Sequence, residues 1–173
     1  MAAAKLEDPM EYLRKEILGS PVACFDETGM RVAGKLPYLH NASTADVTYQ
    51  TVNVHRGRQG MNAGRVLPYY KGIAIHDCLT AYWKYEGIAM HGVCCAHLLR
   101  ECQGLHEMYP EDVFFRYFQV LLREMLDAKK KRIQQGKDAG RYYLKKYMRL
   151  YDLLISVGRY EHPPVEQEEK KRG

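Results

Sequence analysis

The chain of 173 residues lacks the features that mark secreted and membrane proteins. Its five cysteines are an odd number without the spacing of a disulfide framework, which indicates reduced thiols. No stretch is apolar over the roughly 20 residues that a membrane-spanning helix needs. Residues 1–7 contain no apolar core of a signal peptide. These absences exclude the secreted and membrane classes and predict a cytoplasmic protein.

The charge of the chain as a whole is not strongly biased to one sign. Lys and Arg total 26 against 21 Asp and Glu, and the net charge of +5 is compatible with nucleic-acid binding without establishing it. The basic residues are unevenly distributed, because nine of them and one acid fall between Lys129 and Arg149. Such a block is either a solvated helix face or a surface that contacts phosphates. Ordinary shares of hydrophobic (46%) and charged (27%) residues exclude the disordered and collagen-like classes.

The hydrophobic pattern predicts a mixed α/β domain followed by two long helices, without internal repeats. The first three strands are expected to form an antiparallel meander. In chain order, the predicted elements are a helix at 9–18, strands at 21–25, 35–41 and 47–54, a helix at 57–66, a strand at 72–76, a helix or turn at 79–85, a strand at 88–95, and helices at 96–107, 111–133 and 139–157. This order suits a mixed sheet with flanking helices. A ribonuclease-H-like fold begins in the same order, and other α/β folds also accommodate it.

Local turn signals complete this division of the chain. Asp26-Glu27-Thr28-Gly29 predicts a turn directly after the first strand, and Gly158 is predicted to cap the last helix. The last two helices, joined by a short polar turn, form a helical hairpin. The expected parts are an N-terminal helix (1–20), a core (21–108), the hairpin (109–160) and a disordered, charged tail (161–173).

Two acids are distinguished by their positions after strands. Asp26 follows the first predicted strand and Asp77 follows the fourth. If these strands are neighbours, both carboxylates emerge at one end of the sheet, where active sites of open α/β sheets lie. Paired carboxylates are suitable ligands for Mg²⁺ ions that promote phosphoryl transfer. The alternative is that both aspartates cap turns, as aspartates at strand ends often do.

Short motifs in a fixed order extend over most of residues 9–107. They are Asp26–Lys35, Tyr38–Thr44, Arg56-Gly57, Leu67-Pro68 with Gly72, His76-Asp77, Tyr82 with Lys84-Tyr85, and Cys94–Glu101. In this order and spacing the chain resembles the central region of insertion-sequence-66 family transposases. The helical hairpin also stands where that family carries one.

The resemblance implies a ribonuclease-H-like catalytic core with an acidic triad of two Asp and one Glu. Asp26 corresponds to the first acid and Asp77 to the second, so both are expected to be catalytic metal ligands. The family's third acid is a Glu in an Asn-Asn-x-Ala-Glu-Arg type motif beyond the hairpin, and no such motif occurs here. We therefore expect a partial catalytic core of a DNA transposase, truncated before the third acid and inactive alone.

The implied chemistry is metal-dependent DNA strand cleavage and strand transfer. The expected cofactor is Mg²⁺ or Mn²⁺, weakly bound because one acid is missing. The expected partner is double-stranded DNA of the transposon ends and the target, with a second copy of the chain as a candidate partner. No membrane and no organic cofactor are expected, and the implied location is the bacterial cytoplasm, in association with the nucleoid. The alternative function is a non-catalytic DNA-binding or dimerisation remnant of a transposase.

Cys94-x-x-His97 resembles a motif that several transposase families place after the second acid. His97 and Arg100, one helical turn apart, are expected to support the site and to contact DNA phosphate. The rival hypothesis is a small zinc-binding module, because five potential ligands lie close in sequence: His91, Cys94, Cys95, His97 and Cys102. For Cys95, the favoured interpretation is a small core residue.

The remaining candidates are basic and aromatic residues. Lys129, Lys130, Lys131 and Arg132 are predicted to be exposed near the hairpin turn and to bind DNA. The apolar residues expected between the two hairpin helices are Phe114, Phe118, Leu121, Leu144, Tyr147 and Leu154. Tyr82, Trp83 and Tyr85 are predicted to be core residues, with stacking on DNA bases as the alternative.

Overall fold

The computed structural model describes residues 7–137 and 140–163. The chain forms two compact units, Met1–His97 and Leu98–Gly173, which are described separately. None of the helices in the described ranges combines the length and the apolar character that a membrane span requires.

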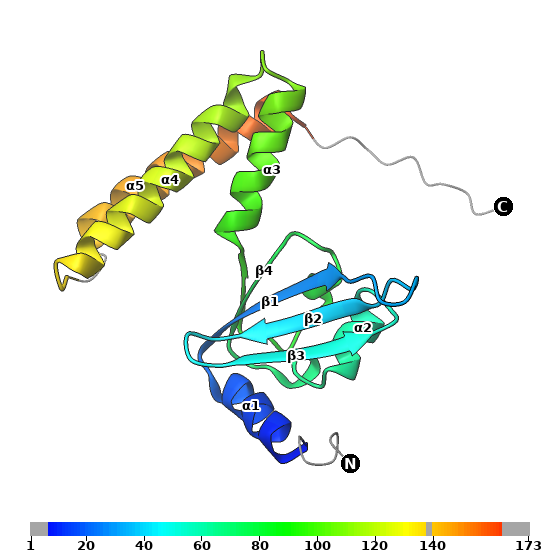
Figure 1. The fold of residues 1–173 in the computed structure, drawn as a ribbon. Helices are drawn as coiled ribbons and strands as arrows, with labels where there is room; N and C mark the ends of the chain where they lie inside the picture. The colour runs from blue at the N-terminus through cyan, green and yellow to red at the C-terminus, as the bar shows by residue number, and fades with distance from the viewer. Residues whose placement is uncertain (1–6, 138–139, 164–173) are drawn as a thin grey trace. The chain divides into compact units, whose positions relative to one another are not determined.

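The first unit contains a five-stranded mixed sheet (Figure 1). Its strand order is β3-β2-β1-β4-β5, in which β1, β2 and β3 are antiparallel neighbours and β4 and β5 run parallel to β1. The prediction of a mixed sheet with a meander is confirmed. The elements of this unit are α1 (Glu7–Gly19), β1 (Val22–Gly29), β2 (Tyr38–Ser43), β3 (Thr48–Asn53), α2 (Arg58–Ala63), the 3-10 helix η2 (Leu67–Tyr69), β4 (Ile73–His76), the 3-10 helix η3 (Tyr82–Lys84) and β5 (Met90–Val93).

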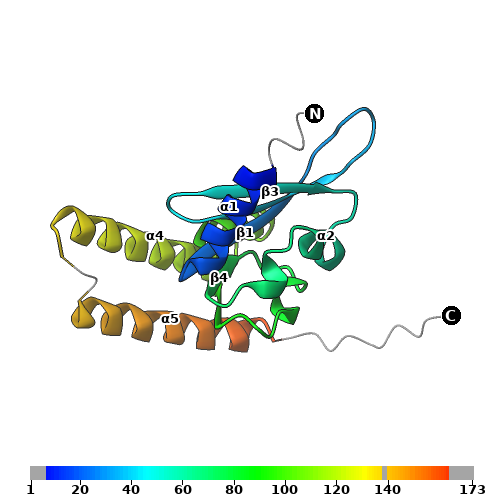
Figure 2. The ribbon, with the colours of Figure 1, turned by 90° about the horizontal axis from the view of Figure 1, so that it is seen from below.

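One face of the sheet carries the hydrophobic core of the first unit. Successive strand side chains point to opposite faces, so Ala23 and Phe25 of β1 are buried while Cys24 between them is exposed. Helix α1 packs against β3 and contributes the fully buried Ile17, and α2 contacts β2 and β3 (Figure 2). The Tyr70 ring meets Phe25 edge to face at 5.3 Å between centroids. Burial of these apolar side chains holds the helices against the strands.

The turn predicted at residues 26–29 is wrong, because β1 continues to Gly29. Asp26 pairs with Asn41 of β2, and the pairing runs on to Gly29 opposite Tyr38. The chain instead reverses between Met30 and Pro37, where Ala33 and Gly34 have left-handed backbone angles (φ 49° and 79°). Cross-strand pairing with β2 overrides the local turn preference of this segment. Strand β2 accordingly begins later than predicted.

The second unit consists of helices. Helix α3 (Cys95–Met108) begins at the end of the first unit, and it is followed by α4 (Val113–Gln134) and α5 (Arg141–Glu161). Helices α4 and α5 lie side by side and antiparallel, which confirms the predicted hairpin (Figures 1 and 2). Asp112 caps α4 by accepting a hydrogen bond from the Phe114 amide at 3.0 Å. Gln119 of α4 donates to the carbonyl of Leu99 of α3 at 3.2 Å.

The predicted interior of the hairpin is correct in part. Phe118 and Leu121 are buried, and the Phe118 ring lies 5.7 Å from that of Tyr151 on α5. Tyr147 and Leu154 are half-buried. Leu144 is 52% exposed, so its prediction as an interhelical residue is wrong.

Gly158 does not cap α5, because the helix continues to Glu161 and ends at His162. Gly158 is buried, and a Cβ atom at this position would overlap the ring of Phe114 on α4. The glycine therefore permits close approach of the two helices. Of the tail predicted at 161–173, residues 164–173 lie outside the described residues.

Candidate active site

Asp26 and Asp77 lie on neighbouring parallel strands. The β1–β4 pairing aligns Val22 with Ile73 and Cys24 with Ile75. Continued by two residues, this register brings Asp26, within β1, opposite Asp77, directly after β4. Both residues are half-buried. The strand register therefore places the two predicted acids opposite each other on the neighbouring inner strands β1 and β4.

The turn-capping alternative describes part of what Asp77 does, whereas Asp26 lies within β1 and caps no turn. Asp77 Oδ1 accepts a hydrogen bond from the Leu79 amide at 3.0 Å, and Asp26 Oδ1 accepts one from the Glu27 amide at 2.8 Å. A carboxylate has about four acceptor positions on its two oxygens, so one such bond leaves capacity for a cation. The hydrogen bond that each aspartate accepts is thus compatible with metal binding.

Tyr82 is a buried tyrosine near the predicted acids. Its side chain is 1% exposed, and burial raises its pKa far above the usual range, with smaller contributions from the negative charges of Glu27, Asp77 and Asp26. The phenol therefore stays protonated at neutral pH. The carboxylates of Glu27, Asp77 and Asp26 therefore all lie near this buried hydroxyl.

His97 and Cys94 join the end of β5 to the start of α3. The Cys94 amide donates to the His76 carbonyl at 2.7 Å, and the His97 amide donates to the Cys94 carbonyl at 3.0 Å. His97 Nε2 lies 3.8 Å from Asp26 Oδ1, an ion pair when the imidazole is protonated. The predicted proximity of His97 to the acids is thus present at Asp26. Arg100 is exposed in the second unit, and its role stays a prediction.

The clustered cysteines and histidines do not form a convergent metal site in the described residues. Within those ranges, the one group of three metal-ligating side chains whose ligand atoms lie within 4.8 Å of one another is Asp112, Glu161 and His162. His162 Nε2 lies 3.2 Å from Asp112 Oδ2, and Asp112 also caps α4, so an ion pair and helix capping account for two members of this group. Cys95 is half-buried, and burial raises the pKa of its thiol.

Glu27 is a buried acid that the sequence pattern did not reveal. Its side chain is 0% exposed, although it directly follows Asp26. Arg56 Nε donates to Oε1 at 2.7 Å, the Gly57 amide donates to Oε2 at 3.1 Å, and His40 Nδ1 lies 3.6 Å from Oε2. The hydrogen bond to Glu27 raises the pKa of Arg56. Residues 56 and 57 are thereby tied to β1 beside the first acid.

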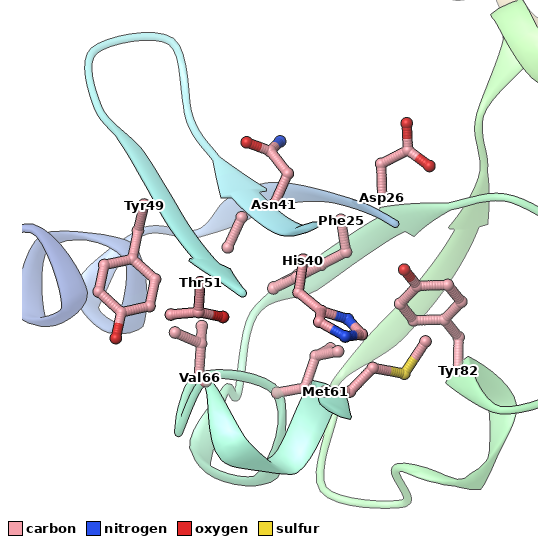
Figure 3. A pocket seen from close by; sticks show the side chains of 12 residues that line it. Phe25, Asp26, His40, Asn41, Tyr49, Thr51, Met61, Val66 and Tyr82 are labelled. Atoms are coloured by element: carbon pink, nitrogen blue, oxygen red, sulfur yellow. The ribbon is translucent and has the colours of Figure 1, made fainter. Parts of the chain in front are cut away.

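A small pocket lies under the strands at this point (Figure 3). His40, Met61 and Tyr82 are among the side chains that line it, while Asp26 and Asn41 point to the opposite side of the strands. The volume of about 20 Å³ accommodates one water molecule at most. The pocket is therefore part of the core packing, and the Asp26 carboxylate lies on the other side of the strands (Figure 3).

His76 links the second acid to an aromatic cluster. Its ring is 0% exposed, and burial lowers its pKa, so the neutral form is favoured. His76 Nδ1 lies 2.6 Å from the Asp77 carbonyl, which can only accept, so Nδ1 carries the proton. Nε2 then accepts from His91 Nδ1 at 2.8 Å.

The aromatic residues before β5 have different environments. Tyr82 and Tyr85 are buried, which confirms the prediction that they are core residues, and burial raises the pKa of Tyr85 to about 12. Trp83 is 47% exposed, so the core prediction is wrong for this residue.

Comparison with known proteins gives one match. The model of the family described as "Transposase IS66 family" matches residues 1–157. No curated protein and no solved structure matches the chain. Because the match covers most of the 173 residues, the chain belongs to the IS66 family of transposases.

Proposed function

We propose that Asp26 and Asp77 are the metal ligands of a ribonuclease-H-like catalytic core for DNA strand cleavage and strand transfer. The observation that carries this proposal is the register of the adjacent parallel strands β1 and β4, which brings Asp26 within β1 opposite Asp77 directly after β4, in a chain of a transposase family. The strand order β3-β2-β1-β4-β5 supports the fold assignment.

The chemistry of these side chains fits a hard divalent cation. Carboxylate oxygens are the ligands that Mg²⁺ prefers, and one or two carboxylates with several waters fill its octahedral shell. When bound, the metal would supply activation of a water or 3′-hydroxyl and stabilisation of the leaving oxygen. In this proposal Asp26 and Asp77 hold the ion, and His97 orients the Asp26 carboxylate. Cys94 fixes the start of α3 on the end of the sheet, and Arg100 is assigned to DNA phosphate.

Mn²⁺ binding tests the ligand assignment. We expect Asp26→Asn and Asp77→Asn each to weaken binding by at least about tenfold, since even in bulk water a unit charge ~4 Å from a divalent ion contributes roughly 2 kcal/mol. Binding is measured from the electron paramagnetic resonance signal of free Mn²⁺. Asp46→Asn, at an exposed loop position, is the matched control and should bind as the wild type does. Unchanged binding in either site variant would remove that residue from the site.

We also propose that the lysines near the end of α4 contact DNA. Lys129, Lys130 and Lys131 are exposed, as predicted. Arg132 is half-buried, and its guanidinium lies over the Tyr143 ring at 5.2 Å, so its predicted exposure is wrong. The three lysines are therefore the stronger candidates for phosphate contacts.

Replacing Lys129, Lys130 and Lys131 with Ala should weaken duplex binding about tenfold. The slope of log affinity against log salt concentration should become shallower by about two to three, since each phosphate contact releases roughly 0.9 counterion. Binding is measured by fluorescence anisotropy at several salt concentrations. A triple Ala variant at Lys15, Lys35 and Lys71, exposed lysines of the first unit, removes the same charge and is the control. Equal losses in the two variants would contradict a specific role for the hairpin.

A further inference from the structure

Trp83 is the single tryptophan of the chain and lies partly outside the core. Its neighbours Tyr82 and Tyr85 are 1% and 6% exposed, whereas Trp83 is 47% exposed. The indole is in contact with two rings, those of His91 and His76, each 5.1 Å away between centroids. The indole therefore packs against two rings while part of its surface is exposed to solvent.

A chain of hydrogen bonds fixes the rings that support Trp83. His76 donates to the Asp77 carbonyl and accepts from His91, as described above. The His76 ring also stacks on that of Tyr82, with centroids 4.6 Å apart and 15° between the planes. Because the supporting rings are held before any ligand arrives, binding to the indole costs little ordering. The His76 ring that contacts Trp83 is thus hydrogen-bonded to the backbone of Asp77.

Trp83 lines an open groove together with basic and amide side chains, including Arg58, Asn62 and Lys84. The groove contains one acid, Glu86. Arg58 lies over the Tyr85 ring at 5.8 Å, and the Tyr85 hydroxyl donates to Asn62 Oδ1 at 2.7 Å. This bond uses the Asn62 oxygen and leaves its amide nitrogen as a potential donor. An aromatic face, two cations and an amide are the groups that recognise a nucleotide.

We propose that this groove binds an unpaired nucleotide of a DNA strand, with its base stacked on Trp83 and its phosphate beside Arg58 and Lys84. The assignment of DNA as the ligand rests on the proposed function. The base must be unpaired, because bases inside a duplex are stacked on each other and their faces cannot reach an indole. The groove would hold one nucleotide of a locally opened strand.

Emission of Trp83 measures this binding directly, because no other tryptophan contributes. A single-stranded oligonucleotide of mixed sequence, titrated in EDTA, should quench the emission in a saturable way. A strand of the same length with abasic sites should quench little, and a blunt duplex of the same sequence should behave like the abasic strand. Quenching by the abasic strand or the duplex equal to that by the normal strand would overturn the proposal.

Variants test the groups involved, with anisotropy of a labelled single strand as the readout. Trp83→Leu should weaken binding about tenfold, the scale of one stacked base. Trp83→Tyr retains a stacking ring and should stay within about threefold of the wild type, which separates stacking from a loss of folding. Arg58→Gln should weaken binding, and Lys35→Ala, an exposed lysine outside the groove, should not. Wild-type affinity in Trp83→Leu, or a full loss in Trp83→Tyr, would contradict the stacking role.

The metal site and the groove are tested independently. EDTA removes divalent ions, so quenching measured in EDTA does not depend on metal binding. Quenching of the wild type in EDTA, together with Mn²⁺ binding that is lost in Asp26→Asn, supports both proposals. Intact Mn²⁺ binding without quenching overturns the groove alone, and quenching without any Mn²⁺ site leaves the groove as a nucleic-acid site and removes the proposed catalytic function.

Discussion

A polypeptide of residues 1–173 should neither nick nor join DNA that carries transposon ends, in Mg²⁺ or in Mn²⁺. Two divalent ions bring four positive charges together, and Asp26 and Asp77 supply two negative charges to offset their repulsion. One ion can bind with two carboxylates and waters, but the second is expected to bind weakly or not at all. A polypeptide extended through the family's third acid, together with the regions that bind the transposon ends, should cleave in a metal-dependent way.

In the extended polypeptide, Asp26→Asn or Asp77→Asn should lower the cleavage rate at least about a thousandfold, the scale seen when one member of a catalytic set is removed. Asp46→Asn should cleave at the wild-type rate, because Asp46 is an exposed loop residue. Cleavage is followed on labelled end-bearing DNA by denaturing gel electrophoresis. Robust cleavage by residues 1–173 would mean that another acid of these residues completes the site, and the charge comparison above would be wrong.

The positions of the two acids were accessible from sequence because each follows a short apolar run. The run before Asp77 is bounded by Gly72 and reads as a buried strand, and β4 is found at Ile73–His76. The adjacency of β1 and β4 is a different kind of property. This adjacency depends on hydrogen bonds between segments that are far apart in sequence. The local pattern is compatible with such pairing, and the family resemblance predicts it.

The turn predicted around Glu27 and the helix cap predicted at Gly158 were wrong for the same physical reason. Asp26–Gly29 has turn-forming residues, yet the strand continues because β2 pairs with it. The partners that bury Glu27 come from residues 40, 56 and 57, which no local window contains. Gly158 has the usual identity of a helix cap, but the Phe114 ring that excludes a Cβ there lies on the other helix. Local signals describe backbone preferences and cannot report a tertiary partner.

Arg56→Met should lower the free energy of unfolding of the first unit by about 2–3 kcal/mol. Glu27 has a fully buried side chain, and Arg56 provides its shortest hydrogen bond, at 2.7 Å. Removing one partner of a buried ion pair typically costs 3–5 kcal/mol, and the lower figure of about 2–3 kcal/mol applies because the Arg56 side chain is 56% exposed and partly screened. Urea unfolding followed by Trp83 emission measures this unit. Arg31→Met, at an exposed arginine in the 30–37 turn, is the control and should change stability by less than about 0.5 kcal/mol.

A second substitution, Glu27→Gln, distinguishes the effect of a buried unpaired charge from a simple loss of packing. Glu27→Gln keeps the shape of the side chain and removes its charge, so in the Arg56→Met background it should recover about 1 kcal/mol or more of the lost stability. In the wild-type background the same substitution should be destabilising, because the Arg56 and Gly57 donors then face a weaker acceptor. The opposite signs make a double-mutant cycle decisive. Additive effects of the two substitutions would mean that Arg56 acts through its aliphatic stem, and that residues 56 and 57 are held beside Asp26 by other contacts.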